Sequence, residues 1–273
     1  MPRAHANGIE LEYESIGDPH APPLVMIMGL ASQMIVWPDE LCELLAARGF
    51  RVIRFDNRDV GLSTRPAGFY TLDDMADDTA GLLDALDLPA AHIVGISMGG
   101  FIAQLVAIRH PARIESLCIM MSSTGARDVG QPAPDILPML MQPVPAEREA
   151  HLAHRVPIAR RLSSPGYPFD EARIRRVYGR SFDRAFFPLG GQRQLAAVMA
   201  SSDRTARLAA VRAPTLVIHG DADPIVNVSG GEAIARAIPG AKLRVFPGLG
   251  HDLPAMLWDT FADAIAANAR KTP

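Results

Sequence analysis

The residues best suited to chemistry are centred on a serine that stands among glycines. Ser97 lies in the segment GISMGG (residues 95–100), which follows a short apolar run and leads into a segment that is apolar on nearly all sides. A turn this tight between a strand and a helix forces its central residue into a strained backbone conformation, so that the side chain stands at the tip. Gly95 and Gly99 remove the Cβ atoms that would collide there. The first N–H groups of the helix then point at the space beside Ser97, where an oxyanion could form.

A glycine-rich turn that binds a dinucleotide is the alternative explanation of this segment. Such turns carry the pattern GxGxxG at the end of a strand, with an acidic residue after the next strand. Neither feature is present around residues 95–100. The segment therefore favours a nucleophilic serine on a strand-to-helix turn.

The elements that would position Ser97 follow an alternating pattern of strands and helices. Residues 8–13 alternate between apolar and polar positions, as in a half-buried antiparallel strand. Helical spacing of apolar residues predicts helices at residues 38–47, 71–86 and 98–108. Short apolar runs typical of strands buried on both faces of a parallel sheet cover residues 24–28, 51–56, 92–97, 116–122, 214–220 and 242–247. This alternation predicts a wound α/β sheet.

The alternation lapses between about residues 126 and 206. This stretch contains clustered prolines and an arginine-rich run from Arg155 to Arg184, and it has no strand-like apolar run. We expect a helical insertion here, the cap segment (residues 126–205), between two strands of a core made of residues 1–125 and 206–273. The arginines could bind an anionic substrate, but a solvated helix face is the favoured interpretation, because exposed arginines are the norm.

The turn around Ser97 and the order of the elements resemble the α/β-hydrolase fold family over nearly the whole chain. The resemblance implies a mostly parallel, eight-stranded α/β-hydrolase sheet flanked by helices, with a helical cap inserted after the sixth strand. Residues 37–40 (WPDE), 52–56 (VIRFD) and parts of 155–170 are similar to the subgroup that contains aclacinomycin methylesterase. This closer similarity implies an ester substrate, such as a methyl ester.

An acid and a histidine follow Ser97 in the order that this family uses. Asp223 and His251 each come shortly after an apolar run, so each would lie at the carboxyl end of a strand, where such sheets gather their ligands. The family pattern GxxD, counted from Gly220, selects Asp223, whereas Asp221 is expected to bond the backbone of its own loop. A histidine oriented by a carboxylate can accept the proton of a serine hydroxyl and return it to the leaving group.

Other polar residues near these segments are interpreted as structural. His219 lies within the end of a strand, His92 opens a strand, and His110 stands at the end of a helix, where it would cap carbonyl groups. The loop DNRDVGLS (residues 56–63) matches the family pattern DxRxxGxS, and its side chains are expected to tie that loop to the sheet.

The resemblance also implies an oxyanion hole made of two backbone N–H groups. One belongs to the residue after the nucleophile, here Met98. The other belongs to the residue after a His-Gly pair; a methionine replaces that histidine here, and the role passes to Leu30. An apolar substrate pocket is expected nearby, although several of its candidates could equally fill the core. These candidates are Gly29, Met34, Trp37, Met139 and Met141.

Composition limits the expected partners and location. The chain has 273 residues, 48% of them hydrophobic, and a net charge of −3, so we expect binding to neither nucleic acid nor an anionic membrane. Cys42 and Cys118 form no paired motif and are expected to be buried in a reducing compartment. Without an apolar signal peptide or a membrane-spanning run, the protein is expected to be globular and cytoplasmic. Metal-ligand motifs are absent, and we expect no metal and no cofactor.

These features together predict a serine hydrolase that cleaves carboxylic esters of small molecules through an acyl-enzyme intermediate. Perhydrolysis of the haloperoxidase type, lactone opening and C–C bond hydrolysis use the same three residues, and the sequence does not separate them. A ligand receptor on a hydrolase fold is the non-enzymatic alternative. The complete set of Ser97, Asp223 and His251 favours an enzyme, and the oligomeric state stays open.

Overall fold

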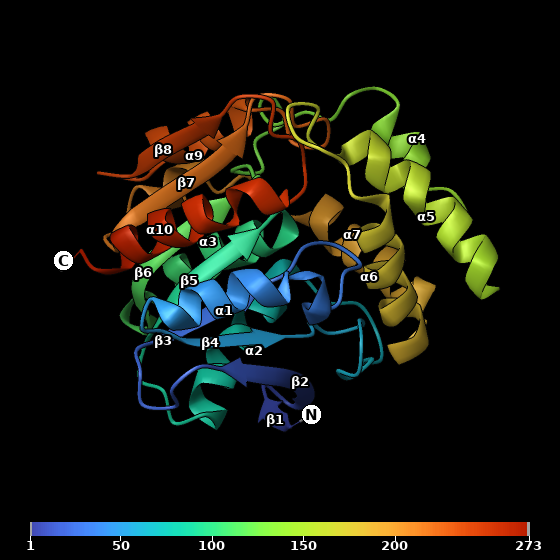
Figure 1. The fold of residues 1–273 in the computed structure, drawn as a ribbon. Helices are drawn as coiled ribbons and strands as arrows, with labels where there is room; N and C mark the ends of the chain where they lie inside the picture. Colours follow the sequence, from blue (N-terminus) through green and yellow to red (C-terminus); the bar gives the residue numbers. More distant parts are fainter. Residues whose placement is uncertain (1, 272–273) are drawn as a thin grey trace.

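One eight-stranded sheet organises the molecule. The computed structural model describes residues 2–271, and its strands follow the order β1-β2-β4-β3-β5-β6-β7-β8 (Figure 1). Strand β2 runs antiparallel to both of its neighbours, whereas the pairs from β4 to β8 are parallel. The predicted α/β sheet is therefore confirmed. Its strands are β1 (Arg3–Ala6), β2 (Ile9–Ile16), β3 (Pro23–Ile27), β4 (Arg51–Phe55), β5 (Ala91–Ile96), β6 (Ile114–Met120), β7 (Thr215–Gly220) and β8 (Lys242–Phe246).

Burial along the strands follows their position in the sheet. Every residue of β5 and of β7 is buried, because helices cover both faces of the sheet there. In β8, by contrast, Lys242, Arg244 and Val245 are exposed. The expectation that residues 242–247 form a strand buried on both faces is therefore wrong, since β8 is the edge strand. Charged side chains suit such an edge because they discourage pairing with another chain.

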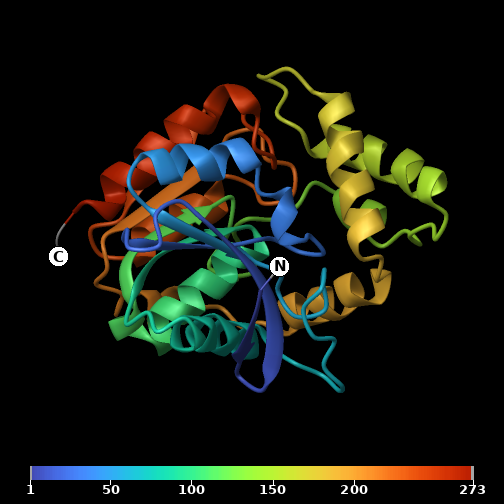
Figure 2. The same ribbon diagram turned by 60° about the horizontal axis from the view of Figure 1, so that its bottom comes forward.

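Two helical layers enclose the sheet. Helices α1 and α10 pack on one face, and α2, α3 and α9 pack on the other (Figure 1 and Figure 2). No helix within residues 2–271 combines the length and the apolar character needed to cross a membrane. The helices of these layers are α1 (Asp39–Ala47), α2 (Leu72–Ala85), α3 (Met98–Arg109), α9 (Ser229–Ala237) and α10 (Trp258–Ala269), with short 3-10 turns η1 (Met34–Val36), η2 (Pro111–Arg113) and η3 (Ala255–Leu257).

Local sequence signals account for the start of α2 and the burial of α3. The Thr71 side chain accepts the N–H of Asp74, and the Asp74 carboxylate accepts the N–H of Thr71, which forms a capping box. Helix α3 is buried along most of its length, as its nearly continuous apolar sequence predicts. This helix begins directly after Ser97 and fixes the direction of the turn that carries it.

The cap segment is helical and lies beside the carboxyl ends of the strands (Figure 2). This segment lies between β6 and β7 in the chain, which agrees with an insertion after the sixth strand. Its division from the core, at residues 126 and 205, stays a prediction. The helices between β6 and β7 are α4 (Ile136–Leu140), α5 (Arg148–Leu162), α6 (Glu171–Arg184), α7 (Pro188–Ala200) and α8 (Thr205–Leu208).

Candidate active site

Ser97 stands on a sharp turn between β5 and α3. Its backbone dihedral angles, φ 56° and ψ −121°, are strained for a residue that has a side chain. A Cβ atom on Gly95 would lie 2.2 Å from the Gly99 carbonyl oxygen, and a Cβ atom on Gly99 would lie 2.1 Å from the Ile27 carbonyl oxygen. Both glycines are therefore required by close backbone approaches, which is the reason given for them from the sequence.

The turn after β3 lies directly beside Ser97. A Cβ atom added to Gly29 would lie 3.2 Å from the Ser97 Cβ and 3.7 Å from its Oγ. Among the described residues, no hydrogen bond occupies the N–H groups of Leu30 and Met98. For Met98 this follows from its place as the first residue of α3, since the first N–H groups of a helix have no partner within it. The two candidate donors thus belong to the two segments that border the serine.

Asp223 and His251 are hydrogen-bonded to each other. His251 Nδ1 lies 2.7 Å from Asp223 Oδ2, while Asp223 Oδ1 accepts the N–H groups of Ile225 and Val226 at 2.9 Å each. Burial alone would raise the pKa of Asp223, but the His251 ring and the Val226 N–H lower that pKa below its usual value. The carboxylate is therefore ionised at neutral pH. It holds the imidazole by Nδ1 and leaves Nε2 as the nitrogen that can face a hydroxyl group.

The competing carboxylate, Asp221, has a different partner. Its Oδ1 accepts the N–H of Gly248 at 2.7 Å, which ties the loop after β7 to the loop after β8. The expectation that Asp221 bonds the backbone of its own loop is therefore wrong. The two loops lie side by side because β7 and β8 are neighbours in the sheet, which the sequence does not reveal.

Buried His219 supports the loop that carries Asp223. Its Nε2 lies 2.7 Å from the Val226 carbonyl oxygen, so this nitrogen carries the proton. Burial lowers the pKa of His219, and the ring is therefore neutral. A Cβ atom on Gly231 would lie 2.5 Å from the His219 Nδ1, so the backbone of α9 packs tightly against the ring. His219 is structural, as its position in the strand indicates.

Two further histidines are structural in different ways. His92 Nδ1 lies 3.0 Å from the Ser116 hydroxyl on the neighbouring strand. The expectation that His110 caps carbonyl groups is wrong: its Nε2 lies 2.7 Å from Asp77 Oδ1 on the adjacent helix α2. Within residues 2–271, the His, Cys, Asp and Glu side chains form no group of three or more that could hold a metal ion.

The last residue of α5 and the segment that follows it hold the loop of His251. The N–H of His251 donates to the Leu162 carbonyl at 2.8 Å, and the N–H of Gly250 donates to the Ser164 hydroxyl oxygen at 2.8 Å. Ser164 also hydrogen-bonds the carboxylate of Asp252. No local feature of the sequence indicates the role of Ser164, because nothing near it marks a contact with a residue 86 positions away.

The loop at residues 56–63 braces the turn beside Ser97. Asp56 accepts the N–H of Met34 at 2.8 Å, and the Asn57 side chain donates to the Met28 carbonyl at 3.0 Å. Arg58 and Asp78 form a buried ion pair with a shortest distance of 2.6 Å. These contacts agree with the interpretation of this loop as scaffold.

The arginine-rich run of the cap segment is not uniformly a solvated face. Arg160, Arg161 and Arg180 are exposed and pair with acidic residues at the surface, as expected. Arg184 differs: its side chain is nearly buried and lies 2.6 Å from the fully buried Asp56. The expectation is therefore wrong for Arg184, because the end of α6 rests on the core instead of facing solvent.

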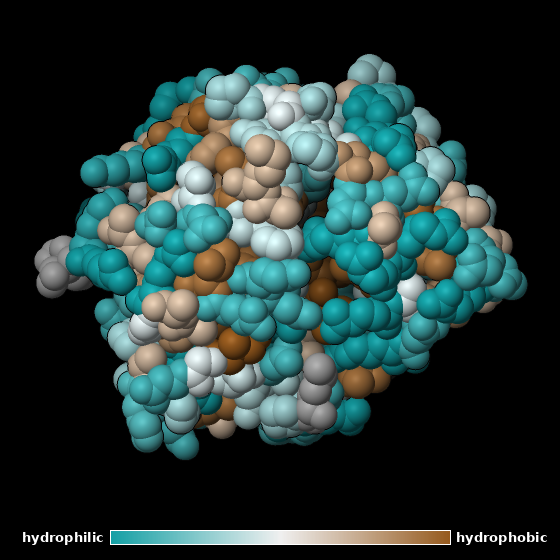
Figure 3. Space-filling model, in the orientation of Figure 1, coloured by the Kyte–Doolittle hydropathy of each residue, from teal (hydrophilic) through white to brown (hydrophobic). Residues whose placement is uncertain are grey.

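The predicted pocket residues lie in different environments. Met34 and Trp37 are fully buried, and Trp37 belongs to the core cluster that α1 and α10 cover. Met139 is half-buried on α4, and Met141, just beyond that helix, is 67% exposed. Gly29 lies directly beside Ser97, since a Cβ atom on it would lie 3.2 Å from the Ser97 Cβ. Figure 3 shows apolar atoms at the bottom of a recess between the core and the cap segment.

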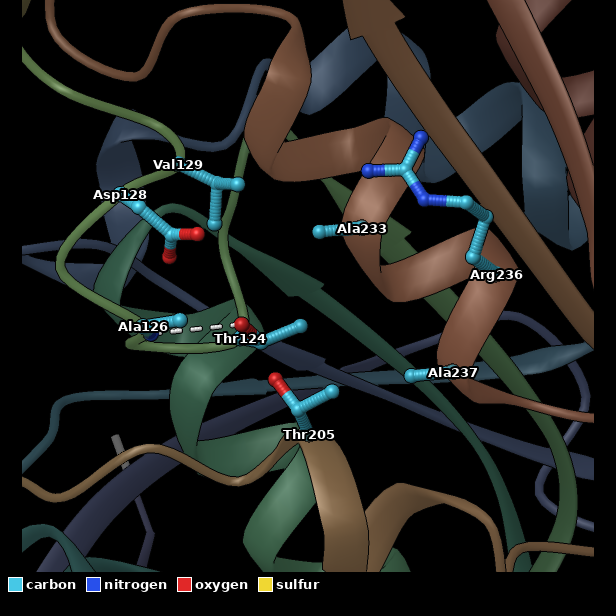
Figure 4. Close-up of a pocket in the computed structure, with 8 residues that line it drawn as sticks. All are labelled: Thr124, Ala126, Asp128, Val129, Thr205, Ala233, Arg236 and Ala237. Carbon is cyan, nitrogen blue, oxygen red and sulfur yellow. Dashed lines mark hydrogen bonds between the residues drawn. The ribbon is translucent and has the colours of Figure 1, made fainter.

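A separate pocket of about 260 Å³ lies between the segment after β6 and helices α8 and α9 (Figure 4). The candidate site residues do not line it. It is therefore distinct from the substrate pocket expected beside Ser97. Its lining consists of Thr124, Ala126, Asp128, Val129, Thr205, Ala233, Arg236 and Ala237.

Comparisons with known proteins identify a matching family, similar sequences and similar solved structures. Residues 22–254 match the family model described as alpha/beta hydrolase fold. Rhodomycin D methylesterase DauP of Streptomyces sp. (strain C5) is 34% identical, and the match covers 96% of this chain and 95% of the relative. Rhodomycin D methylesterase DnrP of Streptomyces peucetius is 33% identical with the same coverage. Among solved structures, the enol-lactonase from Burkholderia xenovorans LB400 is 26% identical, with a TM-score of 0.79 over 99% of this chain and 100% of that one.

Proposed function

Because this chain belongs to the α/β-hydrolase fold family, we propose that it is a carboxylic-ester hydrolase whose nucleophile is Ser97. The observation that carries the proposal is the hydrogen bond of 2.7 Å between Asp223 and His251. These residues follow β7 and β8, and Ser97 follows β5, so all three stand at the carboxyl edge of one parallel sheet. The strained turn of Ser97 presents its hydroxyl group at the same edge.

Each residue of this set has one chemical role. His251 accepts the hydroxyl proton at Nε2 as Ser97 attacks the ester carbonyl, and it then gives that proton to the leaving alcohol. Asp223 stabilises the imidazolium that forms and keeps the ring in the correct tautomer. Water, activated by the same histidine, releases the acid from Ser97 and restores the free enzyme.

The backbone N–H groups of Leu30 and Met98 are proposed to form the oxyanion hole. Both are free of other hydrogen bonds among the described residues, and Gly29 brings the turn of Leu30 against the serine. Because these donors stabilise the charge that develops in the transition state, each is expected to lower the reaction barrier by about 3 kcal/mol. A backbone donor also explains why a methionine can replace the usual histidine before Gly29.

A methyl ester of an apolar molecule is the proposed substrate. Two relatives at 33% and 34% identity are named rhodomycin D methylesterases. The apolar recess between the core and the cap segment suits an apolar acyl group (Figure 3). In this proposal residues 126–205 act as a cap over the site, and the products are a carboxylic acid and methanol. No metal, cofactor or macromolecular partner enters the reaction.

Lactone opening is the second candidate, and the likeness to an enol-lactonase favours it. A lactone is a cyclic ester, so Ser97 would form the same acyl-enzyme, with the alcohol still attached to the acyl group. The two candidates differ in the shape of the pocket and not in the three residues. Rates on a methyl ester and on a lactone of matched size separate them.

The test compares the wild-type protein with Ser97→Ala on short p-nitrophenyl esters. We expect kcat to fall about 10⁴-fold or more in the variant, because the nucleophile is gone. A fluorophosphonate probe should label the wild type at Ser97 and leave the variant unlabelled.

Ser116→Ala is the matched control, since Ser116 is a buried serine that pairs with His92 on the sheet. Its kcat should equal that of the wild type. Equal activity in Ser97→Ala and in the wild type would refute the proposal.

A further inference from the structure

Gln194 of α7 joins the cap segment to the turn that carries Leu30. Its side chain is fully buried, its Oε1 accepts the N–H of Ala31 at 2.8 Å, and its Nε2 donates to the Arg58 carbonyl at 2.8 Å. We propose that Gln194 is a positioning residue that aims the Leu30 N–H at the oxyanion. The inference rests on the oxyanion hole of the proposed function and adds a residue that no motif in the sequence marks.

The turn between Met28 and Ala31 is held at both ends. The Met28 carbonyl accepts a hydrogen bond from Asn57 at 3.0 Å, and the Ala31 N–H donates to Gln194 at 2.8 Å. Ala31 has φ 55°, a left-handed conformation that a residue with a Cβ atom adopts at some cost. Leu30 lies between these two fixed points, so the direction of its N–H depends on both of them.

Helix α7 is seated too closely on the core for Gln194 to shift freely. A Cβ atom on Gly191 would lie 2.8 Å from the Ala31 Cβ, and a Cβ atom on Gly190 would lie 1.9 Å from the Asp59 carbonyl oxygen. Arg193 adds an ion pair of 3.2 Å to Asp59. Two glycines and a salt bridge therefore hold the helix in the register that points Gln194 at the turn.

An amide is suited to this place. The carboxamide presents an acceptor to the Ala31 N–H and donors to the Arg58 carbonyl, and one orientation satisfies both groups. Without Gln194 the N–H of Ala31 would lose this partner, and the turn could rotate to find another. Such a rotation would move the Leu30 N–H away from the oxyanion, where small displacements are costly.

The experiment replaces Gln194 by methionine, which has a similar length and offers no amide. We expect kcat/KM for p-nitrophenyl acetate to fall about 10- to 100-fold. We also expect the inhibition constant of an aryl trifluoromethyl ketone to rise by a similar factor, because its adduct with Ser97 places an oxyanion in the same hole.

Asn268→Leu is the matched control. Asn268 is also a buried amide that bonds two backbone carbonyls, those of Leu117 and Pro214 at 3.1 and 3.0 Å, but it lies on α10. This variant should lower the melting temperature and leave both kinetic constants unchanged.

The outcomes separate the inference from the proposed function. If the wild type neither turns over esters nor reacts with a fluorophosphonate, the proposed function fails and the inference fails with it. If the wild type is active and Gln194→Met keeps its kcat/KM and its affinity for the ketone, only the inference is overturned. Equal losses in Gln194→Met and Asn268→Leu would also overturn it, since they would show an effect of stability alone.

Discussion

At the scale of single residues, Asp223 acts through both of its oxygens. Oδ1 accepts the N–H groups of Ile225 and Val226 and so shapes its own loop, while Oδ2 holds the His251 ring. The nearby Asp221 also accepts a backbone N–H, but from Gly248 on the neighbouring loop. Two carboxylates separated by one residue therefore have different functions, and replacing each by its amide distinguishes them.

Asp223→Asn is expected to lower kcat about 10⁴-fold, because an amide stabilises the wrong tautomer of His251 and offers no charge to the imidazolium. Asp221→Asn keeps an oxygen for the Gly248 N–H and should retain the wild-type kcat. Steady-state kinetics on a p-nitrophenyl ester would measure both. A large loss in Asp221→Asn with little loss in Asp223→Asn would reverse the assignment.

At the scale of elements, an ion pair and hydrogen bonds join the cap segment to the core. Helix α6 ends at Arg184, which reaches the fully buried Asp56, and the residues after α5 reach the His251 loop. Burial raises the pKa of Asp56 even though the Arg184 guanidinium acts in the opposite direction. The Arg184 guanidinium, together with the N–H groups of Met34 and Leu62, thus favours the charged form of this buried carboxylate.

Arg184→Met should lower the free energy of unfolding by about 3 kcal/mol, because it leaves the buried Asp56 without its cation. Urea denaturation would measure the loss. Arg180→Met is the control on the same helix: Arg180 pairs with Asp39 at the surface, where such pairs contribute about 0.5 kcal/mol. Adding Asp56→Asn to Arg184→Met should restore part of the stability. Similar losses in the two single variants would contradict this account.

At the scale of the whole molecule, histidines that are wholly or partly buried link stability to pH. Burial lowers the pKa of His92, of His219 and of His151, the last to about 4. Arg155 and His154 add to the effect on His151, whose ring packs against Phe182 and Phe186 in the cap segment. These rings stay neutral in the folded protein at a pH where the unfolded chain already binds protons.

The melting temperature should therefore fall as the pH is lowered from about 7.5 to 5. Below the unfolded pKa of a histidine the unfolded state binds more protons than the native state, so acid favours unfolding. His151→Phe should make this fall smaller, since phenylalanine packs in the same aromatic cluster and does not titrate. His20→Gln, a change at an exposed histidine, should leave the slope as in the wild type. A slope unchanged in His151→Phe would contradict the prediction.

Much of the fold was predictable because its signals are local. The capping box of α2 and the strain of the turn at Ser97 follow from residues close together in the chain. Burial of a strand depends on its neighbours instead, which is why the prediction that residues 242–247 are buried on both faces is wrong. The partners predicted for Asp221 and His110 are wrong for the same reason, since the actual partner of each residue lies on a segment distant in sequence.

The sequence by itself determined the α/β alternation, the turn at Ser97 and the order of serine, acid and histidine, because backbone sterics and spacing along the chain govern these features. Tertiary structure alone decided the contacts of Ser164 with Gly250, of Arg184 with Asp56, and of Gln194 with Ala31. Each joins the cap segment to a residue of the core far away in sequence. Such contacts arise only when the insertion folds back onto the sheet, and no local periodicity encodes where it comes to rest.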